Sequence, residues 1–333
     1  MNTEVADAAA GAALKSAATP AVISPARALQ TLVRREFWEH PALWRAPLVA
    51  GALLVGVLLI AIFTRMHQHT TVTVDGNAHV LADVVHLDAV SKVAAHTFVQ
   101  GGLWLALSIL ASIVVCFYLL DCLYAERKDR SILFWKSLPV SDGLTVTSKL
   151  IAALVAVPLI VFVSAIGLEL LCTAIWQLWS FTGAAPAVFA WDALEWLRTE
   201  VLILLVTVLA VLWYSPIAGV FLVVSVWARR APVLWVLLPI IFAQVVEQIF
   251  SAIVGTPRFL SHFINYRVFG IWEQLGLFHM HLLGHPGIRP IGSQLKELNF
   301  AAAFTDVDLW LGVIAAGALA YGAVRLRRYR DET

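Results

Sequence analysis

The chain has 333 residues, of which 60% are hydrophobic and 14% are charged, and its formal net charge is +1. Soluble domains carry about 25% charged residues, and here the apolar residues come in long blocks. The composition therefore excludes an ordinary soluble domain and predicts a polytopic membrane protein, with membrane lipids as neighbours and no nucleic-acid partner. Cys116, Cys122 and Cys172 lie in or beside apolar segments and give no disulfide framework.

The first 45 residues divide into two parts. Residues 1–25 are rich in Ala, Ser and Thr, which predicts a disordered cytoplasmic tail. Residues 26–45 predict an amphipathic helix that lies on the membrane surface and ends near Pro41, the alternative being an ordinary solvated helix. Its apolar positions are Leu29, Leu32, Val33 and Phe37, its charged positions are Arg34, Arg35 and Glu39, and Trp38 and Trp44 suit the headgroup layer.

Six segments are long and apolar enough to cross a hydrocarbon core, which takes about 20 helical residues. We therefore expect an all-α polytopic membrane protein with a transmembrane domain at residues 46–325 and a basic cytoplasmic tail at 326–333. The expected spans are 46–64, 98–124, 149–177, 199–227, 231–254 and 307–325. Pro158, Pro216 and Pro239 fall inside three of these spans, and proline there predicts kinks.

Lysine and arginine are concentrated in alternate connections, and such residues stay on the cytoplasmic side of a membrane. With six spans, this predicts that both termini lie in the cytoplasm. We expect the chain in the plasma membrane of a bacterial cell. The basic residues on the cytoplasmic side are Lys15, Arg27, Arg34, Arg35, Arg45, Arg127, Lys128, Arg130, Lys136, Lys149, Arg229, Arg230, Arg325, Arg327, Arg328 and Arg330. The outer connections hold fewer basic residues in a longer stretch of chain.

Two outer connections have patterns of their own. Residues 74–77 read VDGN between β-branched residues, which is typical of a hairpin turn, the alternative being a plain surface loop. Residues 255–306 are too apolar for a free loop and too interrupted for a span. We expect short helices there that dip into or cap the outer leaflet.

The sequence gives little support for catalysis. It contains no GxxxxGK[ST] phosphate-binding loop, no HExxH and no GxSxG, so we expect neither an enzyme nor a nucleotide site in this chain. His281 and His285 have the spacing of a helical ligand pair, with His279 beside them. Gly284 and Pro286 interrupt any such helix, so we expect ordinary loop histidines and no metal.

Polar residues inside membrane spans are costly and are functional candidates by default. Gln244, Glu247 and Gln248 share one face of the fifth span, and Glu169 lies towards the outer end of the third. Such residues either face a substrate pathway or form hydrogen bonds between helices, and the sequence leaves both possibilities open.

The connection between the second and third spans is the densest run of charge in the chain. Residues 125–138 read as a helix that Pro139 ends, and Ser141 or Asp142 can cap the next helix. The apolar residues 132–135 would be exposed to water unless another surface covers them. This favours a protein-docking surface over a helix that rests on the lipid headgroups. Its expected residues are Glu126, Arg127, Asp129, Arg130, Ile132, Leu133, Trp135, Leu138 and Pro139.

These features together resemble the permease subunits of type-2 ATP-binding-cassette (ABC) exporters. The resemblance covers most of the chain from residue 26 onward: the amphipathic helix, the six spans and the helical outer connection before the last span. In the connection between spans two and three it is carried by Glu126, Arg127, Leu138, Pro139, Val140, Ser141 and Lys149. Arg130-Ser131 stands where the common form has Gly-Thr.

The resemblance implies partners and a role. Two separate ATPase subunits would hold the connection's helix in a groove, and a second permease, identical or homologous, would complete the export pathway. Mg²⁺ and ATP would belong to the ATPase, so no cofactor is expected in this chain, and the substrate stays unspecified. Two alternatives are a membrane anchor or sensor that recruits a soluble partner through the same connection, and a metal-dependent membrane enzyme that uses the outer histidines.

Overall fold

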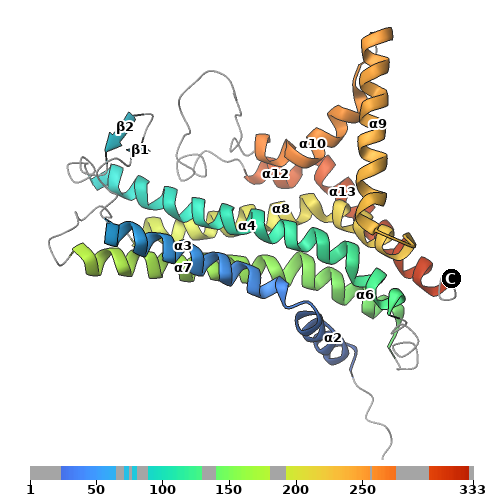
Figure 1. Ribbon diagram of the computed structural model, residues 1–333, viewed down its shortest axis with the longest axis horizontal. Helices are drawn as coiled ribbons and strands as arrows, with labels where there is room; N and C mark the ends of the chain where they lie inside the picture. The colour runs from blue at the N-terminus through green and yellow to red at the C-terminus, as the bar shows by residue number, and fades with distance from the viewer. Residues whose placement is uncertain are drawn as a thin grey trace, which may run out of the picture.

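The computed structural model is a bundle of long helices (Figure 1). It describes residues 24–64, 71–74, 77–80, 89–129, 140–180, 193–255, 257–274 and 300–329. Its helices are α2 (Pro25–Glu39), α3 (Ala42–Thr64), α4 (Ala89–Lys128), α6 (Asp142–Ile151), α7 (Val157–Ser180), α8 (Ala193–Trp227), α9 (Pro232–Val254), α10 (Phe259–Gln274), α12 (Phe300–Thr305) and α13 (Val307–Tyr329).

The prediction of six membrane-spanning helices is confirmed. Six helical stretches are long and apolar enough to cross a membrane, and α6 and α7 together form one of them. The third begins at Asp142 and the fourth at Ala193, earlier than expected, because their first turns are polar and hydropathy alone does not include them. The last helix continues to Tyr329, so the expected tail at 326–333 begins inside α13.

The third span contains a π-helical segment, Ala152–Ala156, between α6 and α7. The N–H of Val157 there bonds to the carbonyl of Ala152, five residues back. Pro158 follows directly, and a proline ring would clash with the carbonyl four residues earlier in a regular α-helix. The wider π turn relieves this clash. Pro216 and Pro239 lie inside the continuous helices α8 and α9.

The described part of the chain is helical apart from one small hairpin. Strand β1 (Thr71–Val74) pairs antiparallel with β2 (Asn77–Val80), and Val74 lies opposite Asn77. This confirms the hairpin expected at the VDGN sequence. The hairpin lies beside the start of α4, at the opposite end of the bundle from α2 (Figure 1).

The core lies among α3, α4, α7 and α8, which run side by side along the molecule (Figure 1). Leu107 of α4 and Leu209 and Trp213 of α8 are fully buried there. By contrast, α9 stands away from the bundle, and its buried residues are Pro232 and Val236 at its first turns. Two helices, α10 and α12, lie between α9 and α13 in the described part of the connection at 255–306.

Several predictions fall outside the described residues. They concern the tail up to residue 23, the connection at 130–139, and residues 275–299 with His279, His281 and His285.

Helix α13 packs along α8 at Gly219. A Cβ atom there would lie 2.9 Å from Leu319 Cβ and 3.5 Å from Ala316 Cα. Gly219→Ala should therefore lower the free energy of unfolding by about 1–3 kcal/mol through overpacking, as measured by denaturation of the purified protein. Gly317→Ala on α13, where a Cβ atom meets nothing within 4 Å, is the matched control and should leave the free energy of unfolding unchanged or raise it by up to about 1 kcal/mol, because alanine favours a helix more than glycine does. Equal losses would contradict this close approach.

Candidate functional site

Six charged residues from four helices meet at one end of the bundle, and we call them the ion-pair cluster. They are Arg35 and Glu36 of α2, Glu126 of α4, Asp142 and Lys149 of α6, and Arg327 of α13. The cluster lies where α4 ends and α6 begins, on either side of the 130–139 connection. Figure 1 shows α2, α6 and the C-terminal end of the chain gathered at this end of the molecule.

Lys149 is the centre of the cluster. Its side chain is 0% exposed, as is that of Glu36. Lys149 Nζ donates to both carboxylate oxygens of Glu36 at 3.0 Å and lies 3.1 Å from Glu126 Oε1. Tyr118 Oη of α4 also donates to Glu36 Oε2, at 2.9 Å. One ammonium thus joins α6 to both α2 and α4.

Glu126 brings two further cations into the cluster. Arg327 Nη2 lies 3.0 Å from Glu126 Oε2, and Arg35 Nη2 donates to Glu126 Oε1 at 3.3 Å. Arg35 also makes a bidentate pair with Glu39 on its own helix, at 2.6 and 3.1 Å. Glu126 therefore connects α4 to α2, α6 and α13.

Arg327 closes the network from the other side, because its Nε lies 3.4 Å from Asp142 Oδ1 in the first turn of α6. The three acids and three bases of the cluster balance each other. Burial lowers the pKa of the nearby His40, so this imidazole is neutral near pH 7 and does not disturb the balance. Buried charges are tolerated where each is paired with a charge of the opposite sign.

Arg127, next to Glu126, bonds to the backbone of α8 and is not a member of the ion-pair cluster. Its Nη2 donates to the carbonyls of Ser225 and Ala228, both at 2.7 Å. These carbonyls belong to the C-terminal end of α8, where backbone acceptors have no partner within the helix and a cation is favoured. Arg127 therefore ties the end of α4 to the end of α8.

The beginning of α6 is fixed locally as well. The Ser141 side chain caps the helix by accepting a hydrogen bond from the N–H of Leu144, at 3.3 Å. This confirms Ser141, one of the two expected caps. The helices on both sides of the 130–139 connection are thus anchored: the end of α4 contacts α2, α8 and α13, and the start of α6 contacts α2, α4 and α13.

Glu126 is buried, and the side chains of Glu126 and Arg127 bind other helices of this chain. Their expected part in docking and coupling to a partner stays a prediction. Asp129 is exposed at the end of α4. The other expected docking residues, Arg130, Ile132, Leu133, Trp135, Leu138 and Pro139, lie outside the described part of the chain.

Sequence reasoning did not identify Glu36 and Arg327 as site residues. Glu36 stands four residues after Leu32 and one before Phe37, so it lies on the apolar stripe of α2, and this was the available signal. Arg327 was assigned to a basic tail because the apolar pattern ends before it. Nothing in the local sequence indicates that its partners are on α4 and α6.

The polar residues of the fifth span divide between two environments. The carboxylate of Glu247 accepts hydrogen bonds from the N–H groups of Leu260 and Ser261 and from the Ser261 hydroxyl, so it caps the N-terminus of α10. Gln244 is half-buried and Gln248 is exposed. Of the two possibilities left open, the contacts of Glu247 are those of a structural hydrogen bond between helices.

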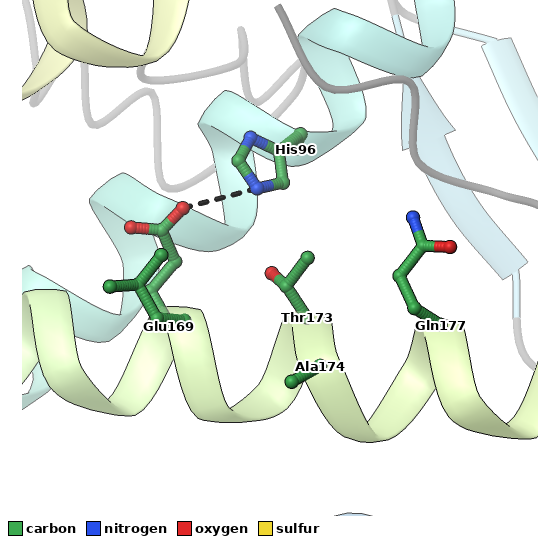
Figure 2. Close-up of a pocket in the computed structure, with 6 residues that line it drawn as sticks. His96, Glu169, Thr173, Ala174 and Gln177 are labelled. Atoms are coloured by element: carbon green, nitrogen blue, oxygen red, sulfur yellow. Dashed lines mark ion pairs between the residues drawn. The ribbon is translucent and has the colours of Figure 1, made fainter. Parts of the chain in front are cut away.

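Glu169 lies in a second polar site near the hairpin end of the bundle (Figure 2). Its Oε1 is 3.1 Å from His96 Nε2 of α4, and Trp196 Nε1 of α8 donates to both of its oxygens at 3.0 and 3.1 Å. Beside this carboxylate is a cavity of about 210 Å³. The residues that line the cavity are His96, Glu169, Leu170, Thr173, Ala174 and Gln177.

One group among the described residues could hold a metal ion: Glu36, Glu39 and His40. Two of its three members are already engaged by cations, Glu36 by Lys149 and Glu39 by Arg35. A metal ion would have to displace an ammonium or a guanidinium that the fold holds in place. The group therefore fits its present ion pairs better than a metal.

No family model matches the chain, and comparisons with curated proteins and with solved structures give no match. The resemblance to type-2 exporter permeases thus rests on the residues of the chain itself.

Lys149→Met should lower the free energy of unfolding by about 3–5 kcal/mol, because it leaves buried carboxylates without their cation. Denaturation of the purified protein at neutral pH measures this. Lys128→Met is the control, since Lys128 is exposed at the same end of the molecule. Its effect should stay within about 0.5 kcal/mol.

A double-mutant cycle separates the ion pair from a general effect of mutation. Lys149→Met combined with Glu36→Gln should cost less than the sum of the two single changes, because both remove the same interaction. Additive losses would show that Lys149 and Glu36 are not coupled.

Proposed function

We propose that the chain is the transmembrane permease subunit of an ATP-driven exporter and that a separate ATPase docks on the 130–139 connection. The observation that supports this best is the anchoring of both flanks of the connection. A plain surface loop needs no buried ion pairs at its two ends. A loop that receives force from a partner does need them, because the force must reach the spans without being lost in local unfolding.

The anchors define the route of that force. Movement of the connection acts on the end of α4 and the start of α6. Lys149 and Glu126 pass it to α2, Arg327 passes it to α13, and Arg127 passes it to α8. Closure of the ATPases around ATP would then move these helices as one body and switch the pathway between two permeases.

The proposed orientation has the ion-pair cluster on the cytoplasmic side of a bacterial plasma membrane. Exposed Arg229 and Arg230, at the tight turn between α8 and α9, then share a side with Arg328. This agrees with the tendency of short basic connections to stay in the cytoplasm. Helices α10 and α12 would lie on the outer side, and α2 would lie along the cytoplasmic surface, with Trp38 75% exposed towards the headgroups.

ATP and Mg²⁺ belong to the ATPase in this proposal. The chain has no phosphate-binding loop of the GxxxxGK[ST] type. The assembly would contain two ATPase subunits and a second permease, identical or homologous to this one. Asp129, exposed at the end of α4, would lie at the polar rim of the docking surface, and the apolar residues from Ile132 to Leu138 would fill its centre.

Trp135→Ala should weaken binding of the proposed partner ATPase by tenfold or more, because buried tryptophans are typical hot spots of interfaces. Affinity between the purified full chain and the ATPase measures this. Trp38→Ala is the matched control, a tryptophan on α2 that should leave the affinity unchanged. Parent-like affinity of the Trp135→Ala variant would contradict the docking assignment.

A further inference from the structure

Helix α2 packs its apolar stripe against the chain itself. Leu32 and Glu36 are buried, and Phe37 packs against the core of the bundle. The helix lies beside α6 at the ion-pair end of the molecule (Figure 1). Since the apolar side of α2 is already covered, the side that faces away from the bundle is the one available to a further partner.

The outward side of α2 is formed by residues at intervals of three or four, which lie on one side of a helix. They are Arg27, Thr31, Arg34 and Trp38, and we call them the cationic face. All four are exposed, and the Trp38 side chain is 75% exposed. The guanidinium carbon of Arg34 lies over the Trp38 ring, 5.6 Å from its centroid, which is within the range of a cation–π contact.

The arginines of the cationic face are not balanced by acids in the described part of the chain. Helix α2 contains two acids, Glu36 and Glu39, and both bind other cations. No acid among the described residues forms an ion pair with Arg27 or Arg34. The face therefore carries a net positive charge, and its complement is a negatively charged surface.

The depth of α2 along the bundle decides which surface it can meet. Tyr118 of α4 donates to Glu36, and it lies about 28 Å along the candidate span that begins at Val99, at 1.5 Å per residue. This is close to the thickness of a hydrocarbon core, about 30 Å. The candidate span in α3 begins at Ala42, and the three residues from Glu39 reach about 11 Å at most. Both anchors place α2 at the level of the lipid headgroups.

The first turn of α3 adds a second arginine and tryptophan at this level. Trp44 and Arg45 are both exposed, and the guanidinium carbon of Arg45 lies 5.2 Å from the centroid of the Trp44 ring. No acid in the described ranges forms an ion pair with Arg45. Tryptophan is enriched in the headgroup layer, and basic residues there are attracted to anionic lipids.

We propose that the cationic face, together with Trp44 and Arg45, binds the headgroups of anionic phospholipids. A guanidinium group matches the geometry of a phosphate and donates two hydrogen bonds to it. A headgroup such as phosphatidylcholine carries its own cation and leaves the charge of the face unbalanced. The inference goes beyond the proposed export function and does not depend on it, because it requires only that the chain lies in a membrane.

The test is a lipid titration of the purified full chain, labelled with fluorotryptophan, in a non-ionic detergent. Dihexanoyl phosphatidylglycerol and dihexanoyl phosphatidylcholine have the same acyl chains and differ in headgroup charge. The fluorine resonance of Trp38, identified by its loss in Trp38→Phe, reports binding at the cationic face. Phosphatidylglycerol should bind at least about fivefold more tightly than phosphatidylcholine. Added salt should weaken its binding, because salt screens exposed charges.

Variants of exposed arginines locate the site and are expected to fold like the parent. Arg34→Gln should weaken phosphatidylglycerol binding about fivefold by removing one charge, and adding Arg27→Gln should weaken it further. Arg34→Lys keeps the charge and should bind more tightly than Arg34→Gln. Arg230→Gln is the matched control, since it removes an exposed arginine from the turn between α8 and α9 and should leave the Trp38 titration unchanged.

The rival occupant of the cationic face is the proposed ATPase, which would approach the same end of the bundle. A double variant Arg27→Gln/Arg34→Gln that binds phosphatidylglycerol like the parent but has lost affinity for the ATPase would assign the face to a protein interface and contradict the proposal. Equal affinity of the parent chain for the two lipids would overturn it as well.

Discussion

The burial of Lys149 is the constraint on which one whole end of this molecule depends. An ammonium with no exposure to solvent is tolerated only where carboxylates surround it, and this chain brings Glu36 and Glu126 to it from two other helices. These carboxylates need further partners, which Arg35, Arg327 and Tyr118 provide. Removing any one of these charges leaves a buried group of the opposite sign without its partner. The positions of α2, α4, α6 and α13 relative to one another therefore depend on the whole network.

The two ends of the bundle differ in how their buried charges are paired. The charges of the ion-pair cluster balance within the chain, so that end is suited to transmitting force rather than to binding small molecules. At the hairpin end, Glu169 pairs with His96 beside a cavity of about 210 Å³. Long helices α4 and α7 reach from one end to the other. In the proposed exporter, they connect the end of the bundle where ATPase movement enters to the hairpin end.

The helices could be predicted from the sequence because their signals are local. Hydropathy located six spans, the serine before Asp142 indicated the α6 cap, and VDGN indicated the hairpin. The ion-pair cluster could not be predicted, because its members are distant in the chain: 113 residues separate Lys149 from Glu36, and 91 separate Glu126 from Arg35. Charged residues beside spans look alike in sequence whether they face water or each other. For the same reason, the sequence did not indicate that Glu126 and Arg127 bind other helices of this chain.

The central claim is that the ion-pair cluster joins α2 and α13 into one body with the start of α6. The most direct test is the distance distribution between spin labels on unnatural amino acids at Thr31 of α2 and Arg328 of α13, both exposed, in the full chain in bilayer discs. The account predicts one narrow distribution in the parent protein and a broad one in Lys149→Met, with Lys128→Met like the parent. Equally narrow distributions in the parent and in Lys149→Met would contradict it.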